Sequence, residues 1–221
     1  MGDLGVKFGD DSEPGIDVIL PDVGFISKNR KRLAGLVITH AHEDHIGAVA
    51  RLWPQLKCEV HCTAFAAELM KLKFREHGIE EDVPVIIHKP LKPFTLGSFT
   101  LEFVNVTHSI PESCALYIET EFGKVLHSGD WKIDRTPLLG PTINEKRFRE
   151  IGDKGVDVLV CDSTNVLREG MSPSEQDVAA TLTDILTHAK GRVTVTTFAS
   201  HVERISSAVT RATAPCREMG V

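Results

Sequence analysis

A cluster of three histidines and an aspartate directly after an apolar run constrains this chain more than any other feature. The run covers residues 33–39 and is typical of a buried strand. Imidazole and carboxylate groups suit zinc, and residues two apart in an extended segment point the same way. His40 and His42 can therefore bind one ion, and the turning chain presents Asp44 and His45 to a second position. A solvated polar loop, the alternative interpretation, does not explain why these polar residues are histidines and an aspartate.

Further candidate residues stand at the ends of other predicted strands. His108 follows an alternating strand, and Asp130 follows an apolar one, where a carboxylate can bridge two cations. Asp3 can accept hydrogen bonds from the histidine segment, and Asp162 ends a further apolar strand. Taken singly, Asp3 and Asp162 are equally well interpreted as turn residues, and a lone histidine at a strand end is more often structural. Because all of them stand at strand ends, one rim of a sheet sandwich can bring them together.

The order of the predicted elements favours an α/β sandwich with mixed sheets over a doubly wound parallel sheet, because hairpin strands interrupt the alternation of strands and helices. Apolar or alternating runs predict strands over residues 33–39, 58–62, 83–88, 98–106, 114–122, 124–128 and 157–161. A helix is expected from Ile46 to Trp53, stopped by Pro54, and another from Thr63 to His77, ended by Gly78.

Two capping patterns predict the last helices. Ser172 at the N-cap, with Pro173 at the first helical position and Glu175 three residues on, predicts a helix to about Lys190. A strand is expected over residues 192–198. A second capping box then opens an amphipathic helix, formed by Ser200 and Glu203 and with an inward apolar face of Val202, Ile205 and Val209.

Composition excludes several classes of protein. The 221 residues are 42% hydrophobic and 25% charged, which is ordinary globular usage and excludes a disordered or fibrous chain. No run reaches the roughly 18 apolar residues of a membrane span, and no signal sequence opens the chain. Because the formal charge is −6, any nucleic-acid role must come from a local site. The five cysteines lack a CxxC pair, which fits reduced cytoplasmic thiols, and Cys58 and Cys62 are expected to be buried small side chains.

The motif HAHEDH, from His40 to His45, matches the HxHxDH motif of the metallo-β-lactamase superfamily. GDLG at the N-terminus, His108 and Asp130 resemble the other motifs of that superfamily. Five segments closely resemble the ribonuclease J family, and the resemblance extends over about Asp3 to Ala208. They are THAHEDHIGAV, VTHSIPES, HSGDWKID, DSTN and TTFAS. The resemblance implies a metallo-β-lactamase αββα sandwich, here partial, and a zinc-dependent nuclease of the β-CASP branch. Members of that family act on RNA as 5′-exonucleases and endonucleases.

The resemblance also implies a set of metal ligands. The first zinc ion takes His40, His42 and His108, the second takes Asp44 and His45, and Asp130 bridges both. Mn²⁺ is the alternative ion at these positions.

The implied catalytic residues are Asp44, Asp130 and Asp162, of which Asp162 matches the first β-CASP motif and stands near the scissile phosphate. Asp3 is implied to support the histidines without touching a metal ion. RNA is the implied substrate, acted on in the cytoplasm and without membrane contact. The full-length protein is implied to be a homo-oligomer.

Two departures from the resembled family concern the ends of the chain. The family's chain begins well before its Asp-Leu-Gly motif, and it continues through a whole β-CASP domain to a last zinc histidine, for which His188 and His201 have the wrong context. Residues 1–191 are therefore expected to form a metallo-β-lactamase domain that lacks its first strands and its last part. Residues 192–221 are expected to begin a truncated β-CASP domain. Such a fragment is expected to be weakly active or inactive.

Two other functions remain open from the sequence. The first is a different hydrolase on the same fold, acting on a lactam, thioester or lactone, since a fold does not fix the chemistry. The DSTN and TTFAS segments disfavour it, because a single-domain hydrolase would end soon after its last histidine. The second is an inactive metal-binding remnant.

Overall fold

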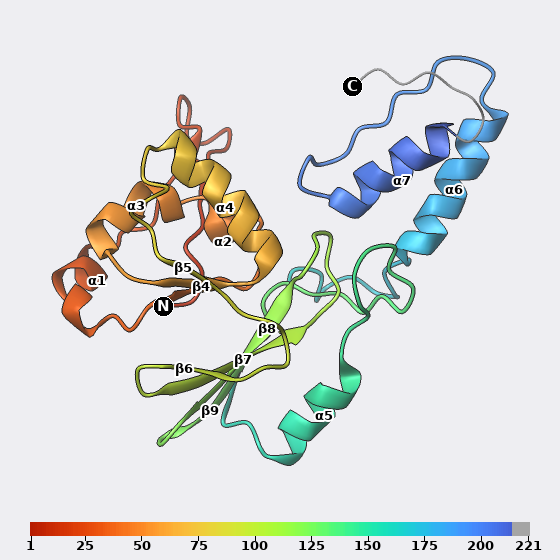
Figure 1. Ribbon diagram of the computed structural model, residues 1–221. Helices are drawn as coiled ribbons and strands as arrows, with labels where there is room; N and C mark the ends of the chain where they lie inside the picture. Colours follow the sequence, from red (N-terminus) through yellow and green to blue (C-terminus); the bar gives the residue numbers. More distant parts are fainter. Residues whose placement is uncertain (214–221) are drawn as a thin grey trace.

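The computed structural model describes residues 1–213, which form two facing β-sheets with helices on their outer sides (Figure 1). The first sheet is parallel, with the order β3 (Leu36–Val37), β4 (Val60–Cys62) and β5 (Val85–Ile87). The second has the order β10 (Val158–Val160), β9 (Gly123–His127), β8 (Cys114–Thr120), β7 (Phe99–Asn105) and β6 (Phe94–Leu96). Only its β10–β9 pair is parallel. Cys216 and the end of the expected 192–221 segment lie outside the described residues.

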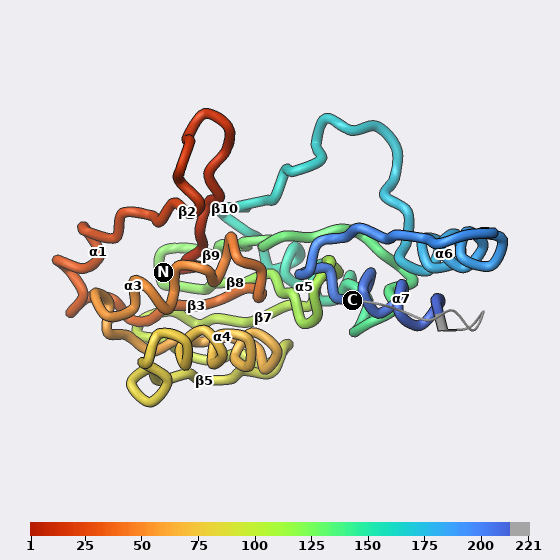
Figure 2. The backbone as a smooth tube through the Cα atoms, turned by 90° about the horizontal axis from the view of Figure 1, so that it is seen from above, coloured from red at the N-terminus to blue at the C-terminus, as the bar shows by residue number. Residues whose placement is uncertain are grey.

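The helices flank this sandwich. Those next to the first sheet are α1 (Gly24–Lys28), the short 3₁₀ helix η1 (Arg30–Arg32), α2 (Glu43–Ile46), α3 (Val49–Leu56) and α4 (Ala64–Glu76). The second sheet carries α5 (Glu145–Asp153), and a pair of helices follows at the end of the chain, α6 (Glu175–His188) and α7 (Val202–Thr213). A small hairpin of β1 (Lys7–Phe8) and β2 (Val18–Ile19) rises on the same side as the segment between β10 and α6 (Figure 2). Within the described part of the chain, no helix is long and apolar enough to span a membrane.

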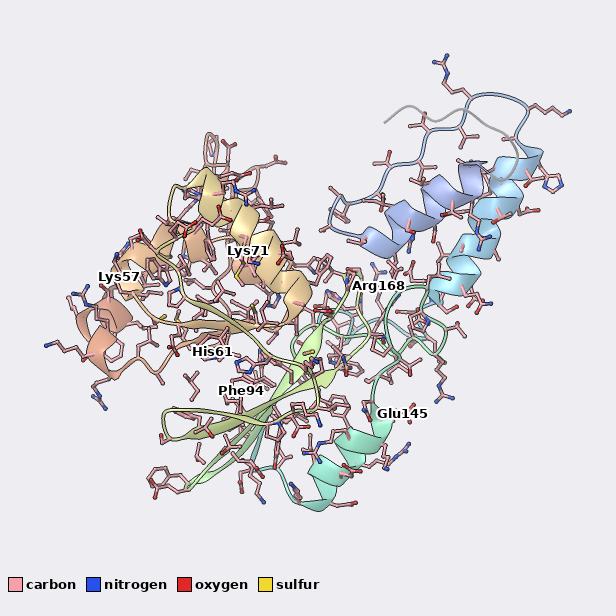
Figure 3. The ribbon with its side chains drawn as sticks, in the orientation of Figure 1. Lys57, His61, Lys71, Phe94, Glu145 and Arg168 are labelled. Carbon is pink, nitrogen blue, oxygen red and sulfur yellow. The ribbon has the colours of Figure 1, made fainter. Side chains whose placement is uncertain are left out.

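Three apolar clusters hold the layers together. The largest packs α2, α3 and α4 on the first sheet, and a second lies between the sheets, where Val37 meets Leu101 and Phe103. His61 of β4 and Phe94 of β6 also face each other between the sheets, with ring centroids 5.7 Å apart (Figure 3). The third cluster packs the outer face of β7 and β8 on α5. Because both faces of β7 are buried, this sheet is an inner layer, and the predicted α/β sandwich with mixed sheets is confirmed.

Local signals account for several elements. Helix α4 begins after Thr63 and ends before Gly78, whose φ of +67° suits glycine, as predicted. The strands around Gly123 pair as an antiparallel hairpin, also as predicted. The prediction that Pro54 stops a helix is wrong, because Pro54 lies inside α3. Proline removes only one N–H group, and the buried face of α3 offsets that loss until the helix ends at Leu56.

The predictions for the last helices need correction at their starts and faces. The N-cap of α6 is Ser174, and not Ser172, because the Ser174 hydroxyl and the Asp177 carboxylate form the reciprocal capping box. On α7, Ile205 and Val209 are 37% and 39% exposed, and the buried positions include Glu203. Ile205 and Val209 therefore do not face inward as expected, whereas Val202 is partly buried and packs against the largest apolar cluster.

Two predicted strands differ from the expectation. Residues 192–198 form no strand, since they pair with no neighbouring strand in the described chain. Strand β10 forms, but Val158, Leu159 and Val160 are 50%, 61% and 49% exposed although their apolar run predicts burial. The difference has a geometric reason: β10 is an edge strand with β9 as its only partner among the described strands.

Candidate metal centre

The histidine cluster lies at the rim where several strands end. The chain leaves β3, extends through His40 and His42, and then turns into α2, whose first turn carries Asp44 and His45. The loop after β7 supplies His108. The second sheet also contributes the loop after β9, which carries Asp130, so both sheets supply side chains to one place.

Three histidines form the tightest group. His42 Nδ1 lies 3.2 Å from His40 Nε2 and 3.0 Å from His108 Nε2. The rings of His40 and His108 have centroids 5.0 Å apart, so their predicted convergence is present in the structure. Two nitrogen lone pairs at such distances repel each other, and a shared proton or a cation between them removes the repulsion. The donor set of this group therefore fits a metal ion.

A second group shares His40 with the first and adds His45 and Asp130. Asp130 Oδ1 lies 3.4 Å from His45 Nε2, while Asp130 Oδ2 lies 4.0 Å from His40 Nε2 and 3.8 Å from His108 Nε2. The two oxygens of one carboxylate thus face the two groups. Asp44 is outside both groups: its Oδ2 lies 3.6 Å from His45 Nε2, and its side chain is 62% exposed.

Asp3 lies behind the cluster and ties its parts together. Its Oδ2 lies 2.9 Å from His45 Nδ1, and its two oxygens accept hydrogen bonds from the backbone and the hydroxyl of Thr39 at 2.8 and 2.9 Å. The Thr39 hydroxyl also lies 3.1 Å from His40 Nδ1. Asp3 therefore contacts one histidine directly and reaches a second one through Thr39.

Gly5 permits this arrangement by letting two backbones touch. Leu4 N–H donates to His45 O at 2.8 Å, and Val6 N–H donates to Glu43 O at 3.1 Å. A Cβ atom on Gly5 would stand 1.7 Å from Asp44 O. Only glycine fits at this close approach, so the segment that carries Asp3 can lie directly against the start of α2.

The loops that carry His108 and Asp130 are joined to each other. Thr107 and Lys132 form an isolated antiparallel bridge, in which Lys132 N–H donates to Thr107 O at 2.9 Å and the Thr107 hydroxyl donates to Lys132 O. Each partner is within two residues of a member of the cluster. The bridge therefore fixes the distance between His108 and Asp130.

A buried ion-pair network connects the Asp130 loop to the last two helices. Glu175, at the start of α6, has a side chain that is 3% exposed, and its Oε1 accepts from Lys132 Nζ at 2.8 Å. Arg204 of α7 donates to the same carboxylate at 3.2 and 3.3 Å, and His201 Nε2 lies 3.5 Å from it. Glu175 thus links α6 and α7 to the loop that follows Asp130.

The remaining sequence candidates lie near the cluster or away from it. Asp162 follows β10, where its N–H donates to Ser128 Oγ and its Oδ1 accepts from Thr164, and its charge acts on His108. It belongs to neither group of possible ligands. His188 is exposed beside Asp184, and His201 is engaged with Glu175, so neither histidine joins the cluster.

Comparison with known proteins decides the family. A family model described as "Beta-lactamase superfamily domain" matches residues 14–197. The chain belongs to the beta-lactamase superfamily. The fold is similar to that of a solved protein of unknown function from Enterococcus faecalis V583. That structure gives a TM-score of 0.61 at 19% identity, over 94% of this chain and 56% of the other.

Within the superfamily, the chain is similar to proteins named ribonuclease J. The relative from Sinorhizobium meliloti is 48% identical over 219 residues, which cover 99% of this chain and 39% of the relative. The relative from Helicobacter pylori strain J99 is 37% identical over 209 residues, which cover 94% of this chain and 30% of the relative. The predicted likeness to ribonuclease J is confirmed. The chain spans well under half the length of these relatives.

The electrostatics of this superfamily domain favour cation binding. Burial and the neighbouring imidazoles lower the pKa of His40 to about 2 and that of His108 to about 4, so both rings are neutral lone-pair donors at ordinary pH. Burial would lower the pKa of His45, but hydrogen bonds with Asp130 and Asp3 outweigh it and raise that pKa to about 10. The bond to His45 lowers the pKa of Asp130 to about 2. The protonated His45 supplies positive charge that a metal ion would replace.

Sequence reasoning did not assign roles to Thr39, His127 or Ser109. Thr39 contacts both Asp3 and His40, and His127 Nε2 lies 3.9 Å from Asp3 Oδ2. Ser109 Oγ lies 3.3 Å from His42 Nε2. Thr39 and Ser109 are each adjacent to a predicted ligand, so their positions gave a signal. His127 is the last residue of β9, and the sequence gave no sign that it would lie beside Asp3.

Proposed function

We propose that this chain is the metal-binding part of a ribonuclease J-type enzyme that hydrolyses RNA phosphodiester bonds with the help of two zinc ions. The observation that carries the proposal is the pair of ligand groups sharing His40, on a chain 48% identical to a protein named ribonuclease J. Three imidazoles with a carboxylate are a donor set that zinc prefers, and Mn²⁺ is the alternative ion.

Zinc in these groups would supply positive charge that lowers the pKa of a water molecule and neutralises phosphate oxygens. The residues of the chain then have separate tasks. His40, His42 and His108 would hold the first ion. Asp130 would contribute to both positions, because its two oxygens face different groups.

The other carboxylates have distinct roles in this proposal. Asp44, which is largely exposed beside His45, completes the second position together with that histidine. Asp162 lies close enough for its charge to act on His108, where it helps to orient the attacking water or the proton donor. Asp3 keeps His45 in place by accepting the hydrogen bond from Nδ1. Asp44, Asp130 and Asp162 are therefore the proposed catalytic carboxylates.

The two metal positions differ in their donors. The first would take three histidines and Asp130, and four such donors are the number that a zinc site normally needs. The second has His45, Asp44 and the shared Asp130, so that fewer atoms of this chain hold it. We expect one tightly held zinc per chain, a weaker second position and weak nuclease activity.

RNA as the substrate, a cytoplasmic location and a homo-oligomeric full-length protein belong to this proposal. The division into a metallo-β-lactamase part, residues 1–191, and the start of a β-CASP part, residues 192–221, also stays a prediction. The alternatives are a lactam, thioester or lactone hydrolase and an inactive metal-binding remnant.

The test compares three substrates at high enzyme concentration. The 221-residue chain is loaded with zinc and incubated with 5′-monophosphorylated single-stranded RNA, with nitrocefin and with a thioester. We expect slow cleavage of RNA that a chelator and His108→Ala both abolish. Hydrolysis of nitrocefin or the thioester, with intact RNA, would favour the other hydrolase. A zinc-loaded chain that leaves all three substrates intact would favour the remnant.

A matched variant controls for folding. His188→Ala removes an exposed histidine outside the cluster. It should leave zinc content and RNA cleavage unchanged, whereas His108→Ala should lower zinc content and abolish RNA cleavage.

A further inference from the structure

A run of positive charges lies just before the first strand of the parallel sheet. Residues 28–32 carry four positive charges and no negative charge. Lys28 ends α1, and Arg30, Lys31 and Arg32 make up η1. All four residues are exposed, and none of them forms an ion pair within the described part of the chain. On a chain with a formal charge of −6, this concentration of unpaired cations is a local feature that the metal centre does not use.

Two further cations from α3 adjoin the run. The Ser27 hydroxyl donates to Gln55 O at 3.3 Å, which joins α1 to the end of α3. Arg51 lies one helical turn before Gln55 on the same face, and Lys57 lies two residues after it. Both cations are exposed, and Figure 3 shows Lys57 on the same side of the molecule as α1. We call these six residues the basic patch: Lys28, Arg30, Lys31, Arg32, Arg51 and Lys57.

The sheet topology places the basic patch away from the histidine cluster. η1 leads into β3, and Lys57 leads into β4, the parallel neighbour of β3. The two segments therefore meet at the amino ends of these strands, whereas the cluster follows β3 at its carboxyl end. Arg32 and His40 are eight positions apart, and an extended segment of that length spans about 25 Å. Figure 1 and Figure 2 both show α1 at one end of the molecule, with α6 and α7 at the other.

Contacts within the fold do not explain this gathering of charge. Like charges on neighbouring turns repel each other, as Lys28 and Arg32 do at a spacing of four residues. The acidic residues next to the patch in the sequence have other contacts: Asp22 accepts from Gly24 N–H, and Glu59 Oε2 lies 3.4 Å from His61 Nε2. The described residues therefore leave the repulsion within the basic patch uncompensated, and an anionic partner would remove it.

An exposed aromatic side chain stands beside these cations. Phe25 of α1 is 80% exposed, and the Asn29 side chain donates to its carbonyl at 2.9 Å. Surfaces that bind single-stranded nucleic acids combine basic groups with aromatic rings on which bases stack. A membrane surface fits less well, because an interfacial helix needs a broad apolar face. Helix α1 has five residues, and its Ile26 packs against the core.

We infer that the basic patch and Phe25 form a binding surface for single-stranded RNA, apart from the histidine cluster. The lysine and arginine side chains bind phosphate oxygens, and Phe25 stacks on a base. Such contacts hold a strand without reading its sequence. Because the surface lies beyond the amino end of β3, it holds a part of the strand remote from the bond to be cleaved. The identity of that strand as the substrate rests on the proposed function, whereas its binding to the patch does not.

The first test measures RNA binding without metal. The 221-residue chain, in excess chelator, is titrated into a fluorescent single-stranded RNA of about 30 nucleotides, longer than the usual sites of about 4–16 nucleotides. Fluorescence anisotropy is read at several salt concentrations. The test variant carries Arg30→Gln, Lys31→Gln and Arg32→Gln, and it keeps Lys57 because the Nζ of that residue lies 4.9 Å from the centroid of the Trp53 ring.

The variant should lose both affinity and salt dependence. Each phosphate contact with a single strand contributes about 0.7 to the slope of log affinity against log salt concentration. We therefore expect the slope to fall by about 2 and the affinity at about 0.1 M salt to fall at least about tenfold.

Two controls accompany this variant. A chain with Lys89→Gln, Lys92→Gln and Lys190→Gln loses the same charge at exposed positions outside the patch, and it should bind RNA as the original chain does. Neither triple variant should lower the melting temperature, because glutamine in the patch removes a repulsion and not a contact. Phe25→Ala should weaken binding about tenfold and leave the salt slope unchanged, since stacking releases no counterions.

The outcomes separate this inference from the proposed function. Equal RNA binding by the two triple variants, or no RNA binding by the original chain, overturns the inference. If vesicles containing phosphatidylserine bind through the patch and RNA does not, the patch is a membrane surface and the inference is wrong. Patch-dependent RNA binding by a chain whose zinc-loaded form leaves RNA intact would refute the proposed hydrolysis and keep the RNA surface.

Discussion

Removing the charge of Glu175 should loosen α6 and α7 more than it disturbs the sandwich. The carboxylate is 3% exposed and contacts Lys132, Arg204 and His201. Breaking a fully buried ion pair costs about 3–5 kcal/mol. The side chains of Lys132 and Arg204 are 22% and 30% exposed, so water can solvate their charges when the carboxylate is removed. We therefore expect Glu175→Gln to lower the free energy of unfolding by about 2 kcal/mol. That loss corresponds to about a thirtyfold rise in the equilibrium constant for opening of the helix pair.

The effect should depend on pH in one direction. Burial would raise the pKa of Glu175, but hydrogen bonds from His201, Lys132 and Arg204 outweigh it and hold the pKa below its usual range. A carboxyl whose folded-state pKa is lowered stabilises the fold above its unfolded pKa of about 4.3 and loses that contribution as the pH falls further. The difference in the free energy of unfolding between Glu175→Gln and the original chain should therefore be constant near pH 7. It should shrink below about pH 4.

Urea unfolding and amide hydrogen exchange along α6 measure this prediction. Glu145→Gln is the matched control, because Glu145 forms a surface pair with Arg149 on α5 and should contribute less than about 0.5 kcal/mol. The reasoning is refuted if Glu175→Gln is as mild as this control at pH 7. It is equally refuted if Glu175→Gln lowers the free energy of unfolding by the same amount at pH 7 and at pH 3.5.

Three further predictions concern the sandwich and the cluster. Gly5→Ala places a Cβ 1.7 Å from Asp44 O, so it should lower the free energy of unfolding in urea by about 3 kcal/mol and reduce the amount of bound zinc. An unchanged zinc content would contradict the close approach of the two backbones. Phe103 is fully buried between the sheets, and Phe103→Ala should cost about 3–5 kcal/mol, whereas a loss below about 1 kcal/mol would mean that the sheets repack. Zinc at a thousandfold excess over its Kd should stabilise the chain by about 4 kcal/mol, read as a melting temperature that a chelator lowers in the original chain but not in His40→Ala.

Local signals predicted those parts of the fold that local chemistry decides. Gly78 ends α4 because its positive φ costs glycine little, and the alternation of residues 98–106 matches β7. Ser172 and Ser174 both stand in capping contexts, and spacing alone could not choose between them. Residues 192–198 have the composition of a strand, but a strand also needs a partner, which no local pattern supplies.

The cluster itself was predictable because its residues are chemically unusual and stand at strand ends. The supporting residues were not. Glu175 and Glu203 are glutamates, which sequence rules place at the surface, and only tertiary packing buries them. The exposure of Ile205 and Val209 follows from the same packing, since α7 turns its polar residues inward to meet Leu139 and Glu175.

The positions of the ligands along the chain set the order in which this protein can fold. Strands β7, β8 and β9 follow one another with short connections, so this meander closes small loops and can form early. The cluster needs more, because His42 and His108 are 66 residues apart and come from different sheets. Zinc affinity should therefore arise only when the two sheets dock. In a refolding experiment, zinc capture should lag behind the recovery of secondary structure.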